Sequence, residues 1–215
     1  LEEAMRKRKL IVIPLENLKG PFGVRKVEAI LDSGRIGMEY GFKLWGKDPA
    51  KAQVKIMGYG NMAMGAIRCA ARKFASIEIL NKRHFSEMGK HLPGTDILVD
   101  AVNRPFRREV KKEPPFVTRK MLKLLKKGSV IVDLVSTPLH HAPVETMRPT
   151  DLIRPYYMVD GIYHTALWGW PGMEPETVAK RYSIQVVPII REIINKGIDH
   201  APTYIKNATL RFDEA

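Results

Sequence analysis

The residues best suited to chemistry in this sequence are spaced as Gly58-x-Gly60-x-x-Ala63. Gly58 allows a sharp turn after an apolar run, and Gly60 has no Cβ to keep a pyrophosphate from the backbone. Ala63 is small enough for a following helix to pack closely, and the N-terminus of that helix attracts phosphate. The alternative is a glycine-rich turn of another α/β protein. The spacing predicts a dinucleotide site with contacts from Gly58, Tyr59, Gly60, Asn61, Met62 and Ala63.

A second group of candidate contacts follows the apolar run at residues 76–80. Sites for NAD commonly carry Asp or Glu about twenty residues after the glycines, where the carboxylate binds the adenosine ribose. Asn81 stands there instead, so no carboxylate repels a 2′-phosphate, and Lys82 and Arg83 can bind one. We therefore predict NADP as the cofactor, with NAD possible. A solvated basic turn is the alternative. A ribose-binding acid is also usual in S-adenosylmethionine sites, which argues against a methyltransferase.

A third group lies at the end of the apolar run at residues 95–102. In a dinucleotide-binding fold the loop after this run passes beneath the nicotinamide ribose. We therefore expect Ala101, Val102 and Asn103 to contact the cofactor, and Asn103 is also placed to reach the substrate. Asp133, at the end of another apolar run, is interpreted as a structural acceptor.

Histidines and tryptophans near the predicted strand ends have two interpretations each. His140 and His141 follow a predicted central strand and could transfer a proton near neutral pH, or could be exposed loop residues. Together with His164 they do not match a known metal-ligand spacing, so no metal site is predicted. Trp168 and Trp170 could form a wall of a substrate pocket or could fill space in the core.

Composition narrows the class of protein. The chain has 215 residues, a formal net charge of +13 and one cysteine, Cys69, which excludes an internal disulfide and a cysteine-rich zinc cluster. No apolar run is long enough to span a bilayer and no signal peptide is evident, so we expect a soluble cytoplasmic protein without membrane insertion. Lys and Arg are spread along the chain without interleaved aromatic residues, which argues against nucleic-acid binding.

Apolar runs alternate with helical patterns along the chain. Strands are expected near residues 10–13, 54–57, 76–80, 95–102, 129–135 and 157–163, and helices near residues 23–33, 34–45, 61–72, 85–91, 119–126 and 176–195. Near-continuous apolar runs are typical of parallel strands that are covered on both faces. The pattern predicts an α/β fold with a doubly wound parallel sheet of the Rossmann type.

The order of these motifs resembles the alanine dehydrogenase and pyridine nucleotide transhydrogenase family, in its cofactor-binding portion. The similar segments are the glycine turn at residues 58–65, residues 95–101, residues 121–133, and residues 159–164 with Pro171, Gly172 and Pro175. The segment at residues 7–12, three basic residues followed by three apolar ones, and the basic turn at residues 81–83 are most similar to the carboxyethyl-ornithine synthase branch. That branch uses NADPH to reduce an imine formed from an amino acid and a 2-oxo acid.

The sequence departs from this family at positions that matter for catalysis. The family's catalytic Asp lies four residues after the position of Asp133, where this chain has Thr137, and the family's Asn before the Pro-Gly turn corresponds to Gly169. The family's substrate-binding Arg, Lys and His lie in an N-terminal domain that has no counterpart in this sequence. The catalytic residues are therefore left unassigned, and we expect a fragment or a separate partner chain.

The resemblance implies an NAD(P)-dependent oxidoreductase that transfers hydride at the α-carbon of an amino or imino acid. The alternative is a non-catalytic nucleotide-binding subunit or regulatory module of the transhydrogenase type. Residues 1–50 are expected to connect from a mostly missing substrate domain, residues 51–170 to form the Rossmann domain, and residues 171–215 to form a long helix and tail. The expected partners are an amino-acid or 2-oxo-acid substrate, and either further copies of the chain or a separate substrate-domain segment.

Overall fold

The computed structural model describes residues 1–104, 113–136 and 141–212. Its contacts divide the chain into two compact units, one made of residues 30–175 and the other of residues 1–29 with residues 176–215. The expected domain boundaries at residues 50 and 170 stay predictions. No helix in the described residues is long and apolar enough to cross a membrane.

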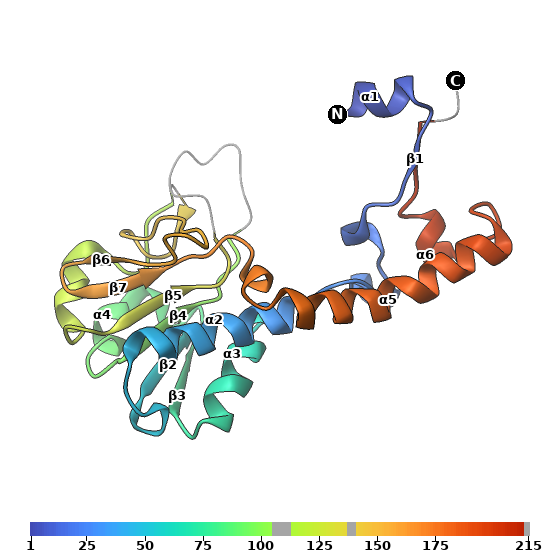
Figure 1. Cartoon of the computed structure of the whole chain (residues 1–215). Coiled ribbons are helices and arrows are strands. Elements are labelled where there is room, and N and C mark those ends of the chain that lie inside the picture. The colour runs from blue at the N-terminus through green and yellow to red at the C-terminus, as the bar shows by residue number, and fades with distance from the viewer. Residues whose placement is uncertain (105–112, 137–140, 213–215) are drawn as a thin grey trace. The chain divides into compact units, whose positions relative to one another are not determined.

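A six-stranded sheet is the centre of the first unit, with the strand order β3-β2-β4-β5-β7-β6 (Figure 1). All neighbouring pairs are parallel except β6 with β7, which is antiparallel and lies at one edge. This mostly parallel sheet confirms the predicted α/β fold of the Rossmann type. The strands are β2 (Gln53–Met57), β3 (Ser76–Leu80), β4 (Ile97–Asp100), β5 (Val130–Asp133), β6 (Tyr157–Val159) and β7 (Ile162–Thr165).

Helical segments cover both faces of the sheet. The side chains of Leu98 and Ile131 pack into an apolar cluster with Met88, Leu92 and Leu122. The opposite face packs against α2 (Ile30–Trp45), and α2 in turn packs against α3 (Asn61–Arg72). The remaining segments of this unit are short: η3 (Pro49–Lys51), η4 (Phe85–Glu87), α4 (Met88–His91), η5 (Arg119–Leu124) and η7 (Trp170–Met173).

The helix α2 corrects two sequence expectations, because residues 23–33 and 34–45 do not form two helices. A single helix begins at Ile30 and ends at Trp45, and the 3-10 turn η2 (Pro21–Gly23) lies before it. Glycines inside α2 disfavour a helix in isolation, but here they allow close packing. A methyl group at Gly34 would lie 1.9 Å from the Met62 carbonyl oxygen. Tertiary contact therefore outweighs helix propensity in this segment.

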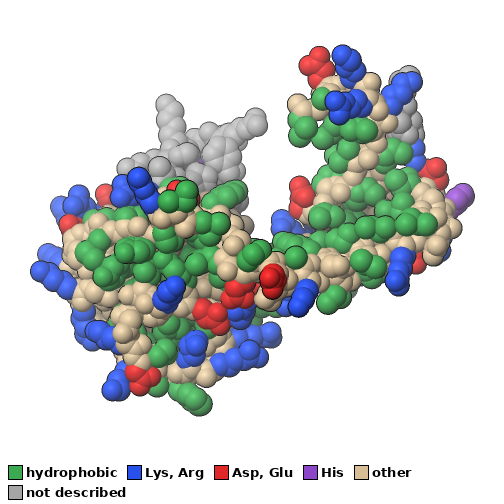
Figure 2. Space-filling model, viewed as in Figure 1, with side chains coloured by type: hydrophobic (Ala, Val, Ile, Leu, Met, Phe, Trp, Pro, Cys, Tyr) green, Lys and Arg blue, Asp and Glu red, His purple; other side chains and the backbone are tan. Residues whose placement is uncertain are grey.

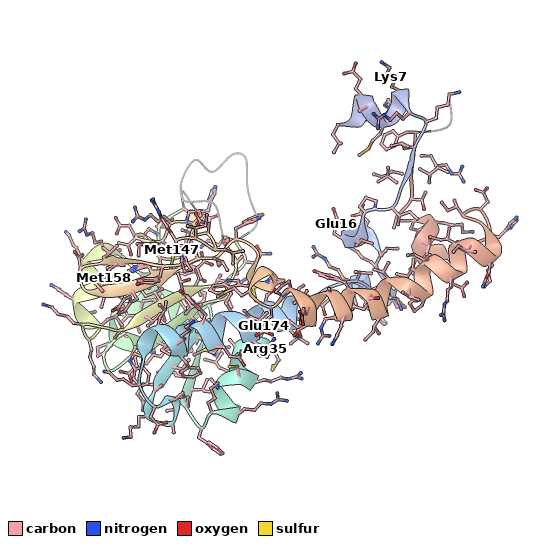
Figure 3. The ribbon with its side chains drawn as sticks, in the orientation of Figure 1. Lys7, Glu16, Arg35, Met147, Met158 and Glu174 are labelled. Atoms are coloured by element: carbon pink, nitrogen blue, oxygen red, sulfur yellow. The ribbon has the colours of Figure 1, made fainter. Side chains whose placement is uncertain are left out.

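An ion pair holds α2 to the segment after η7. The Arg35 guanidinium donates to both carboxylate oxygens of Glu174, with distances of 3.0 and 2.6 Å, and also to Glu39. Figure 3 shows Arg35 and Glu174 facing each other from these two segments. The hydrogen bonds from Arg35 lower the pKa of the Glu174 carboxyl. This bidentate pair fixes the position of η7 on α2.

The predicted helix at residues 119–126 is a shorter 3-10 helix, η5. Thr118 does not cap it through its side chain. The Arg119 N–H donates instead to Glu145 Oε2 at 2.7 Å, so a distant carboxylate supplies the cap. The helix ends at Leu124, and Gly128, with a positive φ of 84°, lies in the turn before β5.

The second unit is built around α5 (Pro175–Lys196), close to the helix expected at residues 176–195. Its other elements are α1 (Glu2–Lys7), η1 (Leu15–Asn17), η2, α6 (Thr203–Lys206) and an antiparallel pair of β1 (Ile11–Val12) with β8 (Leu210–Arg211). A small apolar core holds them together, made of Leu18, Val27, Ile189, Ala201, Ile205 and Ala208. In Figure 2 the Lys and Arg side chains lie in separate groups among hydrophobic side chains on the visible face.

The contact between α2 and α3 gives a test of the packing account. A methyl group at Gly65 would lie 2.1 Å from the Leu31 carbonyl oxygen, so we expect Gly65→Ala to destabilise the protein by about 1–3 kcal/mol. Gly89→Ala in α4 is the matched control, because its nearest atom would be Leu124 Cδ1 at 3.8 Å. Urea unfolding measures both variants. Equal stability of the two would contradict the close contact.

Candidate functional site

The strand register brings the three predicted groups of contacts to one edge of the sheet. Met57 pairs with Leu80 of β3 on one side and with Asp100 of β4 on the other. The residues that follow these strands, Gly58, Asn81 and Ala101, therefore lie next to one another at the carboxyl ends. Because β3 and β4 lie on opposite sides of β2, this edge contains the switch point at which doubly wound folds bind ligands.

The glycine turn has the conformation that the sequence predicts. Gly58 has a φ of +97°, and a methyl group there would lie 2.9 Å from the Ala101 carbonyl oxygen. Gly58 is thus required both by its backbone angle and by the neighbouring strand end. At Gly60 a methyl group would meet no atom within 4 Å, which leaves room for a ligand at the backbone.

The N-terminus of α3 adds hydrogen-bond donors to this turn. Gly60 is the N-cap residue, and no side chain of the described chain caps the helix. Tyr59, Gly60 and Asn61 are exposed, Met62 is half-buried, and Ala63 is buried against the sheet. Unpaired N–H groups at a helix N-terminus, together with the helix dipole, bind phosphate. The residues present therefore fit a dinucleotide pyrophosphate.

The turn after β3 is held by its own hydrogen bonds. Asn81 Oδ1 accepts from the Arg83 N–H at 3.0 Å, and the Asn81 N–H donates to His84 Nδ1 at 2.9 Å. Lys82 and Arg83 are exposed and form no ion pair within the described part of the chain. Sequence reasoning missed His84, whose ring fixes this turn as an acceptor. The two cations are available to an anion at this end of the edge.

Glu78 of β3 carries the carboxylate nearest to this turn along the strand, and it pairs with residues outside the turn. Glu78 Oε2 lies 2.9 Å from Lys55 Nζ and Glu78 Oε1 lies 3.1 Å from His91 Nδ1. The hydrogen bond from Lys55 lowers the pKa of the Glu78 carboxyl, so the side chain is a committed ion-pair partner.

The loop after β4 is the third part of the site. Ala101 and Val102 are half-buried and Asn103 is exposed. The Val102 N–H donates to Asp100 Oδ1 at 3.0 Å, which fixes the first turn of the loop. Arg104 follows as a buried cation, stacked 3.8 Å from the centre of the Phe116 ring, and burial lowers its pKa.

Two buried carboxyl groups lie at the same edge and were missed as a pair by sequence reasoning. Asp100 and Asp133 are paired across β4 and β5, and each has 1% of its surface exposed. Burial raises the pKa of both groups, and raises that of Asp133 to about 6. The signal in the sequence was the Val-Asp dipeptide found in both apolar runs, but only the strand order makes the two aspartates neighbours.

The remaining candidate residues from the sequence, one threonine and three histidines, do not share one environment. Thr137 and His140 lie outside the described residues. His141 is 1% exposed, so the interpretation as an exposed loop residue is wrong for it. His164 is buried and both of its ring nitrogens are in hydrogen bonds, to Thr146 Oγ1 at 2.8 Å and to the Ile162 carbonyl oxygen at 3.0 Å. No group of three or more metal-ligating side chains occurs among residues 1–104, 113–136 and 141–212.

The two tryptophans have different environments. Trp170 is buried against α2, and its Nε1 donates to the Asp133 carbonyl oxygen at 3.1 Å, so it fills space in the core. Trp168 is 78% exposed.

A hollow of about 900 Å³ lies elsewhere on this unit, beside residues 118–127. Its lining includes Lys120, Lys123 and Lys127, together with Arg119, which forms a bidentate ion pair with Asp160. Residues 127–128 precede β5, so this hollow is at the amino-terminal edge of the sheet. None of the predicted dinucleotide contacts lines it. Position at the strand ends, not the size of a hollow, identifies the candidate site.

The parallel sheet, its switch point and the glycine turn define the fold of a Rossmann-type NAD(P)-binding domain. The chain belongs to the family described as alanine dehydrogenase/PNT, C-terminal domain, whose model matches residues 81–210, more than half of its length. The match confirms the family inferred from the motifs. It begins at Asn81, so the glycine turn is supported by its own geometry.

Relatives and solved structures agree with this family. Alanine dehydrogenase 1 of Staphylococcus aureus is 36% identical over 90 residues, which are 42% of this chain and 24% of the relative. The alignment thus spans about a quarter of that relative. The similarity to a carboxyethyl-ornithine synthase stays a prediction.

Two solved structures show the same fold. An L-alanine dehydrogenase superposes with a TM-score of 0.81 and 20% identity, over 99% of this chain and 68% of the other. A transhydrogenase from Sinorhizobium meliloti superposes with a TM-score of 0.78 and 18% identity, over 97% and 69%.

The open side of Gly60 leads to a direct test of the glycine turn. We expect Gly60→Val to abolish dinucleotide binding, because a branched side chain would occupy the space left for the pyrophosphate. The fold should persist, since a methyl group there meets no atom within 4 Å. Circular dichroism checks the fold and fluorescence titration with NADPH checks binding. Gly89→Ala serves as a distant control, and a Gly60→Val variant with normal affinity would place the site elsewhere.

Proposed function

We propose that this chain is the cofactor-binding part of an NADP-preferring oxidoreductase of the amino-acid dehydrogenase or imino-acid reductase type. Hydride would pass between the nicotinamide and the α-carbon of an amino or imino acid. The observation that carries this proposal is the open glycine turn at the switch point, one strand away from a turn that offers Asn81, Lys82 and Arg83 instead of a carboxylate. Family membership supports the reaction class.

Each part of the edge has a separate role in this proposal. The N–H groups of Gly60, Asn61 and Met62 would bind the pyrophosphate, and Lys82 with Arg83 would bind the 2′-phosphate. Residues 101–103 would lie along the nicotinamide end, where Asn103 is exposed and can donate or accept a hydrogen bond. When bound, the cofactor supplies or accepts hydride, and the protein's task is to orient its reactive ring.

The substrate side of the reaction needs groups beyond those at this edge. An amino acid or a 2-oxo acid carries a carboxylate, which proteins bind best with Arg or Lys. We propose that a substrate-domain segment, or another copy of the chain in a homo-oligomer, supplies these groups.

A non-catalytic role is the second candidate. The family description covers both alanine dehydrogenase and PNT, so a nucleotide-binding subunit or regulatory module of the transhydrogenase type fits the same fold. The presence of Thr137 where the resemblance places a catalytic Asp favours this candidate. Cofactor binding without hydride transfer to any amino-acid or oxo-acid substrate would support it.

The basic turn predicts a preference between cofactors. We expect NADPH to bind at least several-fold more tightly than NADH, because one charge-assisted hydrogen bond contributes about 1.5–3 kcal/mol. Arg83→Ala should remove most of that preference. Arg72→Ala, an exposed arginine at the end of α3, should leave it unchanged. Fluorescence titration of both cofactors decides the question, and equal affinities in the unmodified protein would refute NADP as the preferred cofactor.

The substitution at Thr137 predicts a result for activity. A threonine hydroxyl cannot take the ionised role of a carboxylate, so we expect the polypeptide to bind NADPH without oxidising L-alanine. The assay follows NAD(P)H formation with L-alanine and NADPH consumption with pyruvate and basic amino acids. Robust alanine oxidation by this polypeptide would contradict the expectation. Turnover that needs an amino acid and a 2-oxo acid together would identify imine reduction.

A further inference from the structure

The pairing of the buried carboxyl groups of Asp100 and Asp133 has no role in the site described so far. Each is the last residue of its strand, and the two are paired directly across β4 and β5. Neighbouring strands lie about 4.8 Å apart, and residues in register present their side chains to the same face of the sheet. Both residues are 1% exposed. Two acidic groups are thus held side by side away from water.

Each carboxyl group fixes the turn that follows its own strand. Asp100 Oδ1 accepts from the Val102 N–H at 3.0 Å. Asp133 Oδ1 accepts from the Val135 and Ser136 N–H groups, both at 2.8 Å. Ser136 has a positive φ of 54°, so this turn depends on its hydrogen bonds. The buried Asp100 Oδ2 has no hydrogen-bond partner among the described residues.

The charged groups around the pair do not neutralise it. Arg104 attracts Asp100 electrostatically, but its Nε lies 3.5 Å from Glu113 Oε2 and its Nη1 donates to the His141 carbonyl oxygen. Burial raises the pKa of Tyr157 of β6, a further titratable group that senses Asp133, to about 12, so it stays neutral. Burial and the neighbouring carboxylate both raise the pKa of Asp100. Burial and like charge both disfavour the simultaneous ionisation of two adjacent carboxyl groups.

We propose that Asp100 and Asp133 are positioning residues that hold one proton between them and so tie together the turns after β4 and β5. The proton forms an O–H···O hydrogen bond across the two strand ends and supplies the partner that Asp100 Oδ2 lacks. Residues 101–103 follow directly after this pair. Loss of the proton would therefore loosen the nicotinamide end of the site, a consequence that rests on the proposed function.

The pH dependence of stability has a defined sign. The pKa of each group is higher in the folded than in the unfolded protein, so folding favours the protonated pair. The stabilisation from the proton is fully present below the unfolded pKa, near 4 for Asp. The first proton leaves the pair near pH 6, the folded pKa of Asp133, and the shared proton leaves at higher pH, so the stabilisation is lost as the pH rises through about 6 and above.

The first experiment compares thermal unfolding of the whole chain and its variants from pH 5 to pH 9. Asp100→Asn keeps the acceptor for Val102, supplies a permanent donor to Asp133 and removes one charge. We expect the difference in unfolding midpoint between Asp100→Asn and the unmodified protein to increase by about 3 °C or more between pH 5 and pH 9. At pH 8 the variant should have the higher midpoint. Asp133→Asn should show the same trend and serves if Asp100→Asn does not fold.

Asp151→Asn is the matched control. Asp151 is exposed and accepts from the Ile153 and Arg154 N–H groups, the same turn that Asp133 makes, without a buried carboxyl neighbour. Its midpoint relative to the unmodified protein should not rise with pH. A difference between Asp100→Asn and the unmodified protein that is constant over this range would overturn the shared proton.

The second experiment measures NADPH affinity over the same pH range. In the unmodified protein and in Asp151→Asn the affinity should fall more steeply above neutral pH than in Asp100→Asn. Parallel profiles in all three would overturn the link between the pair and the nicotinamide end. Absence of NADPH binding at every pH would refute the proposed function and leave the unfolding result as a separate test of the proton.

Discussion

The parallel register of β3, β2, β4 and β5 is the constraint on which the rest of the first unit depends. Because these strands are in register at Met57, Leu80, Asp100 and Asp133, the residues that follow them form one row. A shift of one residue in any pair would separate the glycine turn from the turns beside it and would move buried side chains to the wrong face. On one face of the sheet, α2 packs closely against α3 at Gly34 and Gly65 and also contacts β4 and β5.

The carboxyl edge and the amino edge of the sheet differ in their electrostatics. The carboxyl edge holds buried groups, Asp100, Asp133 and Arg104, whose desolvation is unfavourable. The amino edge has exposed pairs such as Arg119 with Asp160, which contribute little to stability. Buried polar groups that are only partly satisfied are characteristic of sites that bind ligands. This contrast supports the carboxyl edge as the functional one, although a hollow of about 900 Å³ lies at the other.

The sequence alone predicted the sheet, the glycine turn and the long helix α5, because these depend on local patterns of apolar residues and glycine. It did not predict α2 as one helix, since the favourable contact at Gly34 involves a residue distant in sequence. It predicted a helix at residues 119–126 but not the cap of η5, because the capping carboxylate of Glu145 is distant in sequence. The neighbourhood of Asp100 and Asp133 follows from the strand order, and the burial of His141 is not marked by any local pattern in the sequence.

The measurement that tests the central claim most directly is hydrogen–deuterium exchange of the whole chain with and without NADPH. A dinucleotide bound at the carboxyl edge would protect the backbone N–H groups of residues 58–66 and 81–84, which belong to the glycine turn and to the turn after β3. We expect slower exchange in peptides that cover both segments and unchanged exchange in residues 118–127 beside the hollow. Protection confined to residues 118–127, or none at residues 58–66, would contradict the account.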